Sequence, residues 1–165
     1  MPDPSVPVLM TTVDSPIGRL TLLSKGGRLT RLVMEDQAHA TAVPPDCVRD
    51  DGAFADVVAQ LGEYFAGERT RFEVPMALEG TDFQRRVWSE LCAIPYGRTI
   101  SYGELARRVD NPRAPRAVGS ANGRNPIAVI VPCHRVIAGD GSLGGYGGGL
   151  ERKVVLLELE RAVPS

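Results

Sequence analysis

The sequence lacks the features that would anchor the protein in a membrane or stabilise it through disulfide bonds. No apolar run approaches the roughly 18 residues that a membrane-spanning helix needs. The opening residues, MPDPSVPVLM, have neither the basic start nor the long apolar segment of a secretory signal. The three cysteines, Cys47, Cys92 and Cys133, are widely spaced and form no CxxC unit. We therefore expect reduced thiols and a cytoplasmic protein.

A strong net charge is also absent, but the charges are unevenly distributed. The formal net charge of −1 argues against a general binder of polyanions. Residues 1–80 carry seven basic and twelve acidic side chains, whereas residues 81–165 carry twelve basic and eight acidic ones. Between residues 101 and 135, two acidic residues accompany six arginines: Arg107, Arg108, Arg113, Arg116, Arg124 and Arg135. Because arginine suits bidentate phosphate contacts, a polyanionic partner is one interpretation, and a solvated basic face is the other.

The first eighty residues have the pattern of a small sheet followed by a helix. Alternating or β-branched runs predict strands at VLMTTV, GRLTLLS and RLTRLVME. The pair Gly26-Gly27 between the last two runs suits a two-residue hairpin turn. Two prolines predict a loop over residues 37–50, and apolar residues at helical spacing predict a helix over residues 51–67. The run RFEVPMAL predicts one more strand.

The second half has the pattern of short helices. The sequences TDFQ and SYGE, which start at Thr81 and Ser101, are capping boxes that predict two helix starts. Pro115 suits the first position of a third helix, at about residues 115–123. A final helix is predicted at about residues 150–161, with an apolar side formed by Leu150, Val154 and Leu157. The second and third helices are a candidate helix-turn-helix, so the chain is predicted to be an α+β protein.

The stretch VIVPCHRVI places Cys133 beside His134 and Arg135 at the end of an apolar run. We expect no metal site, because two histidines and three cysteines are spread along the chain. A buried thiol and a nucleophile are the remaining interpretations, and the neighbouring cations favour the nucleophile because they stabilise thiolate. Pro132 is predicted to end a strand before Cys133. Since neighbours on a strand point to opposite faces, either the backbone turns here or a water relays the proton. Cys92 is predicted to be a core thiol.

Five blocks follow one another through the second half: GTDFQRRVW, IPYGRTISYGELA, PRAVGSANGRNP, NPIAVIVPCHRV and GGYGGGLERKVVLLELE. In this order they resemble the O6-alkylguanine-DNA alkyltransferases, and DSPIGRL near the N-terminus resembles a further feature of that family. The resemblance covers essentially all of residues 80–165, whereas the first half matches loosely. It implies a ribonuclease H-like structural domain at residues 1–79 and a domain for DNA binding and alkyl transfer at residues 80–165.

The resemblance implies a direct repair reaction. Members of the family move an alkyl group from O6 of guanine in duplex DNA to their own cysteine, once per molecule and without a cofactor. The matching positions here are Cys133 as the nucleophile, His134 as its base through a bridging water, and Glu160 as the carboxylate that orients the histidine. Asn125 matches the residue that ties the helix-turn-helix to the active-site segment. Tyr102 matches the phenol that donates to guanine N3.

The resemblance also implies how DNA containing O6-alkylguanine is bound. The target base must leave the duplex, and Arg116 matches the arginine that enters the stack in its place from the minor groove. The other DNA-contacting positions are expected at Ala117, Gly119, Ser120, Ala121 and Asn122. The substrate pocket is expected at Tyr146, Gly147, Val136 and Pro132. We expect a monomer; cooperative binding to DNA, activity on O4-alkylthymine and the preferred alkyl size stay open.

A non-catalytic relative that binds alkylated DNA is the main alternative, but such relatives typically replace the cysteine that is present here as Cys133. A DNA-binding regulator with a sensor thiol is less favoured because no additional regulator module is recognisable. A cysteine hydrolase would need an oxyanion-type glycine motif around Cys133, and the sequence has none there. Three positions depart from some relatives: Pro115 before Arg116, Asn122 in place of an apolar residue, and Gly147 in place of a serine.

Overall fold

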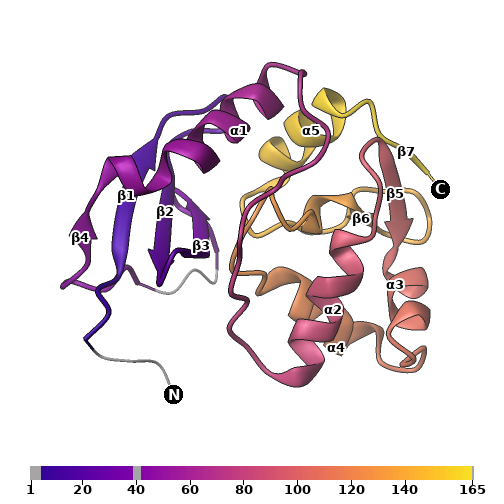
Figure 1. Ribbon diagram of the computed structural model, residues 1–165. Helices are drawn as coiled ribbons and strands as arrows, with labels where there is room; N and C mark the ends of the chain where they lie inside the picture. Colours follow the sequence, from indigo (N-terminus) through magenta and orange to yellow (C-terminus); the bar gives the residue numbers. More distant parts are fainter. Residues whose placement is uncertain (1–4, 39–41, 165) are drawn as a thin grey trace.

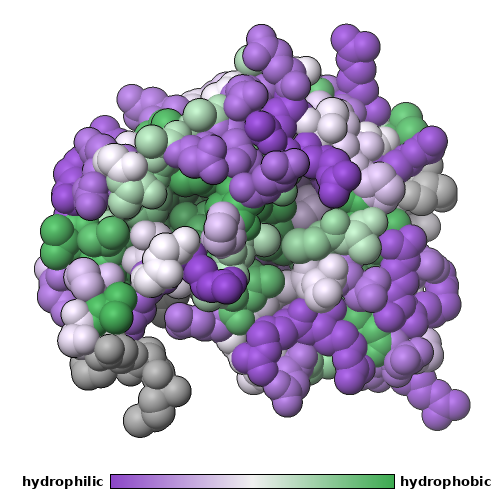
Figure 2. Space-filling view, in the orientation of Figure 1, coloured by the Kyte–Doolittle hydropathy of each residue, from purple (hydrophilic) through white to green (hydrophobic). Residues whose placement is uncertain are grey.

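An N-terminal sheet and a C-terminal group of helices lie side by side in the computed structural model (Figure 1). The structure describes residues 5–38 and 42–164. The chain crosses from one half to the other through residues 66–81, which lie in front of the junction in this view. Figure 2 shows hydrophobic residues gathered along the same junction.

The N-terminal sheet has four strands in the order β3-β2-β1-β4. Strands β1 (Leu9–Val13), β2 (Leu20–Lys25) and β3 (Arg28–Met34) pair antiparallel, and β4 (Val48–Arg49) pairs parallel with β1. The predicted hairpin turn is confirmed, because the two glycines between β2 and β3 have positive φ angles of 59° and 78°. Strand β4 lies inside the predicted loop, where two residues are too few to give an alternating pattern.

The predicted helix of the first half is confirmed as a short 3-10 turn (Asp51–Phe54) that continues into α1 (Ala55–Phe65). Its buried face includes Val57, Leu61 and Tyr64, and the helix packs beside the sheet with its far end near the C-terminal half (Figure 1). Gly67 follows with a φ of 78°, a conformation that ends a helix readily when the residue has no Cβ.

The prediction of a strand at RFEVPMAL is wrong. This segment makes one isolated bridge, between Met76 and Leu29 of β3, with hydrogen bonds from Leu29 N to Pro75 O (2.8 Å) and from Ala77 N to Leu29 O (2.9 Å). The apolar alternation reflects a segment that buries side chains against both halves while it crosses between them. Its backbone is extended without joining a ladder.

The C-terminal half contains the four predicted helices. They are α2 (Asp82–Cys92), α3 (Tyr102–Arg108), α4 (Pro115–Gly123) and α5 (Leu150–Leu159). Both hydrogen bonds of the Thr81 capping box are present, whereas at α3 only the Ser101 hydroxyl accepts, from Glu104 N at 3.0 Å. The Glu104 carboxylate binds two arginines of its own helix instead. Among the described residues, no helix combines the length and apolar character needed to cross a bilayer.

A second, small parallel sheet supports these helices and was not predicted. It has the order β6-β5-β7, formed by β5 (Arg98–Ser101), β6 (Val136–Ile137) and β7 (Val163–Pro164). Strands of two to four residues carry too little periodicity to be recognised in a sequence. The sheet places the end of α5 beside the segment that follows Cys133.

Two predictions about buried side chains are wrong. The inner face of α5 runs through Lys153, Leu156 and Glu160, while Leu150 is 51% exposed at the start of the helix. Cys92 is exposed rather than part of the core. It is the last residue of α2 and lies about 100° around the helix from buried Leu91, so it points away from the core.

Candidate active site

The segment before Cys133 is a series of buried turns, so the predicted strand there is wrong. Val129 has a positive φ of 72°, and the Asn125 side chain holds both ends of the segment. Asn125 Nδ2 donates to Val131 O (2.7 Å), and Asn125 Oδ1 accepts from Ile127 N (3.0 Å). Asn125 lies two residues after the end of α4, so this side chain joins the helix-turn-helix to the segment that carries the cysteine.

Cys133 begins a 3-10 turn, η2 (Cys133–Arg135), and borders a cavity of about 270 Å³. Successive residues in such a turn project about 120° apart, so Cys133 faces the cavity while His134 points into the core. The backbone turn answers the geometric question that the sequence raised. Burial raises the pKa of the Cys133 thiol, and the Asn125 amide and the charge of Lys153 partly oppose that rise.

A fully buried carboxylate lies behind His134. His134 Nε2 is 2.7 Å from Glu160 Oε2, and Arg135 Nε and Nη2 donate to the two oxygens of Glu160 at 2.7 and 3.1 Å. Burial by itself raises the pKa of the Glu160 carboxyl, but the hydrogen bonds and charges of His134 and Arg135 outweigh it and lower the pKa to about 2. Glu160 is therefore an anion that accepts the Nε2 proton of the imidazole.

This pairing defines the proton state of His134. Burial lowers its pKa more strongly than Glu160 raises it, so the imidazole is neutral near pH 7. With the proton on Nε2, Nδ1 is the free base, and within the described residues this buried atom has no hydrogen-bond partner. The arrangement can therefore take up one proton at Nδ1 and stabilise the resulting cation through Glu160.

The cavity beside Cys133 collects several of the predicted residues. Its wall includes Tyr102 from α3, Gly119 and Asn122 from α4, and Tyr146 and Gly147 from the glycine-rich loop. The Tyr102 hydroxyl donates weakly to Gly145 O (3.5 Å). The Tyr146 hydroxyl is buried, has no partner among the described residues, and has a pKa raised well above its usual value, chiefly by burial.

Two residues expected in the substrate pocket lie elsewhere. Pro132 and Val136 are not among the described residues that line the cavity. Val136 is fully buried and offers its carbonyl to Lys153. Pro132 instead borders a separate groove with Cys92 and Arg135, on the other side of η2.

The helix-turn-helix residues divide between surface and core. Arg116, Ala117 and Ser120 are exposed on α4, as expected for residues that contact DNA. Ala121 and Asn122 are only 3% and 5% exposed, so they lie on the inner side of α4, and their expected contact with DNA stays a prediction. With 3.6 residues per turn, Ala121 and Asn122 lie on the same inward face of the helix as buried Val118. On this face, Ala121 O accepts a hydrogen bond from Trp88 Nε1 (2.8 Å). Asn122 Nδ2 points toward Cys133 O at 3.5 Å.

Known proteins match both halves of the chain. Residues 82–162 match the 6-O-methylguanine DNA methyltransferase DNA-binding domain, and residues 8–78 match the ribonuclease-like domain of the same family. A Mycobacterium tuberculosis methylated-DNA–protein-cysteine methyltransferase is 56% identical over 151 residues, which are 92% of this chain and 91% of that protein. This chain belongs to the methylated-DNA–protein-cysteine methyltransferase family.

More distant members and solved structures agree with this family membership. The Methanosarcina mazei methyltransferase is 47% identical over 148 residues, which cover 90% of this chain and 94% of that protein. The crystal structure of Mycobacterium tuberculosis OGT in complex with DNA superposes with a TM-score of 0.88 at 56% identity, over 93% of this chain and 92% of that one. The predicted fold, a sheet-containing first domain before a mostly helical second one, is confirmed.

Two residues of the methyltransferase site could not be recognised in the sequence. Lys153 is fully buried and donates to the carbonyls of Val136 (2.7 Å), Leu143 and Gly145 (3.2 Å), which holds the glycine-rich loop against β6. Burial lowers the pKa of Lys153 to about 8. In the sequence, Lys153 could be noticed only as a lysine among the apolar residues of α5, and a lysine at such a position is usually solvated.

Tyr64, the second residue missed, comes from the N-terminal half. It lies on α1, is fully buried, and donates its hydroxyl to Glu160 Oε2 across 96 positions of sequence. Burial and the Glu160 charge raise the pKa of this phenol, so the hydroxyl keeps its proton and remains a donor. Nothing in the local pattern separates Tyr64 from the other apolar residues of α1.

Proposed function

We propose that the protein repairs DNA by moving the alkyl group of O6-alkylguanine from duplex DNA to Cys133 Sγ, once per molecule. The observation that carries this proposal is the pairing of a cavity-facing cysteine with a buried His134–Glu160 relay directly behind it. Family membership supports the same reaction.

The relay supplies the thiolate that the reaction needs. His134 Nδ1 accepts the Cys133 proton through a bridging water, and anionic Glu160 stabilises the imidazolium. The sulfur bonds to the alkyl carbon while the carbon–O6 bond breaks, and the electron pair stays with guanine. Guanine then gains one proton, which balances the one that left the thiol. Because a thioether is stable, no second turnover follows.

The damaged base reaches Cys133 by leaving the duplex. Arg116, exposed near the start of α4, would fill the vacated place in the stack from the minor groove. Tyr102, at the start of α3, borders the cavity and would donate to guanine N3. The exposed small residues of α4 support close approach of the helix to DNA.

The same proposal includes the broader organisation of the protein. Residues 1–79 would form a structural domain and residues 80–165 the domain for DNA binding and alkyl transfer. The protein would act as a monomer in the cytoplasm, and the free state of all three cysteines supports a reducing compartment. A non-catalytic role in damage recognition is disfavoured by the cysteine and its relay.

Intact mass spectrometry after incubation with an O6-methylguanine duplex tests the function. We expect the wild type to gain one methyl mass and Cys133→Ala to gain none. The matched control is Cys92→Ala, which removes the exposed thiol at the end of α2 and should still be methylated. An unmodified wild type, or a Cys133→Ala protein that still gains the methyl group, would contradict the proposal.

A further inference from the structure

A segment of the N-terminal half forms part of the cavity beside Cys133. Met34, the last residue of β3, and Gln37 and Ala38, which follow it, line the cavity together with the C-terminal residues. Met34 is only 2% exposed, so its side chain is enclosed between the two halves. The alkylguanine site is therefore not closed by the C-terminal half alone.

Hydrogen bonds fix this segment against the glycine-rich loop. Ala38 N donates to Gly147 O (2.7 Å), and Arg152 Nη1 donates to Glu35 O (2.6 Å). The segment is also closed on itself, because Met34 N donates to Gln37 Oε1 (3.0 Å). These contacts hold the Met34 side chain at one place relative to the loop.

Met34 packs directly on the loop that forms the cavity wall. A Cβ added to Gly148 would lie 2.5 Å from Met34 Cε, 2.7 Å from Met34 Sδ and 3.0 Å from Tyr146 Cε2. The Met34 thioether and the edge of the Tyr146 ring therefore both lie close to the Gly148 backbone, where a side chain would have no room. Ala128, another cavity residue, is bound to the same strand through Ala128 N to Leu32 O (3.3 Å).

The cavity is thus lined by both apolar and polar groups. Met34, Ala128 and Tyr146 supply apolar atoms, and Tyr102 and Asn122 supply groups that can hydrogen-bond the edges of a base. An alkyl substituent packs favourably against the apolar groups, and its carbon must approach the sulfur of Cys133, which lines the same cavity. Met34 is only 2% exposed, so its unbranched side chain occupies space at the cavity that a shorter side chain would leave open.

We propose that Met34 of the N-terminal half sets the size of the alkyl group that the site accepts. This inference rests on the proposed function and assigns part of substrate selection to the first domain. Shortening the side chain removes the thioether from the cavity wall and leaves room for a bulkier substituent. Larger alkyl groups should gain more from that room than methyl.

The test compares second-order transfer rates from two duplexes, one with O6-methylguanine and one with O6-benzylguanine. For Met34→Ala we expect the benzyl-to-methyl rate ratio to rise by up to about tenfold, since differences of one methylene in an apolar pocket already change rates by that order. Met34→Leu, which conserves volume, should change the ratio by less than about twofold.

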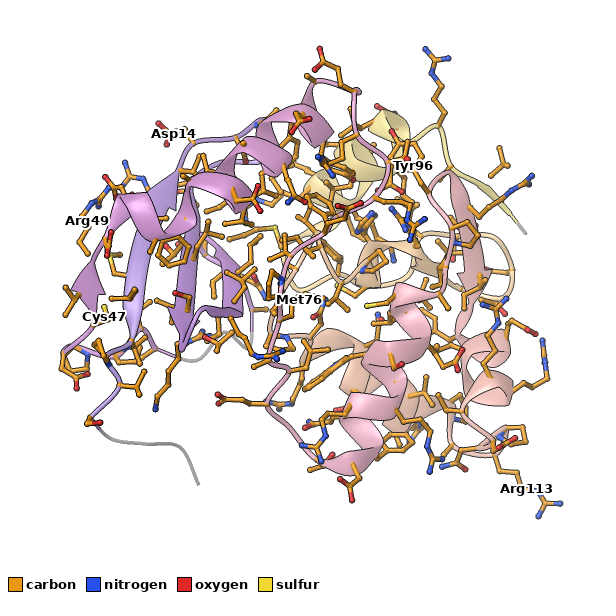
Figure 3. All side chains as sticks on the ribbon, in the orientation of Figure 1. Asp14, Cys47, Arg49, Met76, Tyr96 and Arg113 are labelled. Atoms are coloured by element: carbon orange, nitrogen blue, oxygen red, sulfur yellow. The ribbon has the colours of Figure 1, made fainter. Side chains whose placement is uncertain are left out.

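Met76→Ala is the matched control. Met76 is a half-buried methionine at the junction of the two halves, labelled in Figure 3, and it lines the separate groove behind η2. The benzyl-to-methyl rate ratio of Met76→Ala should equal that of the wild type. If Met34→Ala does not fold, Met34→Val takes its place, because it removes fewer atoms.

The outcomes separate this inference from the proposed function. An unchanged ratio in a folded Met34→Ala or Met34→Val protein would overturn the role of Met34 while alkyl transfer itself stands. An equal rise in Met76→Ala would also overturn it, because general loosening would then explain the effect. A wild type that transfers neither group would contradict the proposed function instead.

Discussion

The two halves of the molecule differ in what they bring to the reaction. The C-terminal half carries Cys133, the proposed nucleophile, the His134–Glu160 pair and the exposed face of α4. The N-terminal half carries none of these, yet Tyr64 reaches the carboxylate and Met34 reaches the cavity. The chemistry is thus concentrated in one half, and the other half adjusts its geometry. Substitutions should therefore have large effects in the second half and smaller, more selective ones in the first.

The largest effect is expected for Glu160→Gln. The amide cannot stabilise the imidazolium, so alkyl transfer should slow by about a hundredfold or more. The buried Arg135 guanidinium would lose its charged partner, which should lower the free energy of unfolding by about 3–5 kcal/mol. Mass spectrometry of reactions quenched at successive times measures the transfer rate, and urea unfolding measures the stability. A variant with wild-type transfer would show that the relay does not act on Cys133.

The low pKa of Glu160 predicts that the comparison with Glu160→Gln depends on pH. The carboxyl has a pKa near 4.5 in an unfolded chain and about 2 in the folded protein. Because the folded value is lower, the stabilisation is complete above about pH 4.5 and is lost as the pH falls toward 2. Urea unfolding at pH 7, 4 and 3 should show the difference in free energy of unfolding between the wild type and Glu160→Gln decreasing as the pH falls. A constant difference would contradict the assigned ionisation.

An intermediate effect is expected for Arg116→Ala, on one class of substrate. Extruding a base costs a few kcal/mol, so transfer from duplex should slow by about ten- to a hundredfold, whereas transfer from free O6-benzylguanine should change little. Arg113→Ala is the matched control, because this exposed arginine points away from the protein at the far end of the second half (Figure 3). Equal slowing on both substrates would remove the proposed role in base flipping.

The smallest effect is expected for Tyr64→Phe, in the first half. Losing one hydrogen bond to a charged group should cost about 1.5–3 kcal/mol of stability and slow transfer by less than about tenfold. Tyr96→Phe is the control, since its hydroxyl donates to Leu159 O at 3.4 Å rather than to the carboxylate. If the two variants behave alike in thermal unfolding and transfer, the first half does not support the relay.

Local sequence determined several helix starts and one turn, in both halves of the chain. The capping box at Thr81, Pro115 at the start of α4 and the hairpin glycines each set the conformation of a few neighbouring residues, so their outcome could be predicted. The five ordered blocks of the second half, of which the motif around Cys133 is one, likewise identified the family and its reaction. The backbone before Cys133 was predicted incorrectly, because apolar residues in buried turns and in a buried strand have the same composition.

Only the tertiary structure decided how the site is completed. Tyr64, Met34 and Lys153 read as ordinary core or surface residues, and each acquires its part from a contact with a segment far away in the chain. A hydrogen bond across 96 positions leaves no periodic signal, since neither partner constrains the residues beside it. The sequence by itself determined the family and predicted Cys133 as the reactive cysteine, and packing of the two halves determined what surrounds that cysteine.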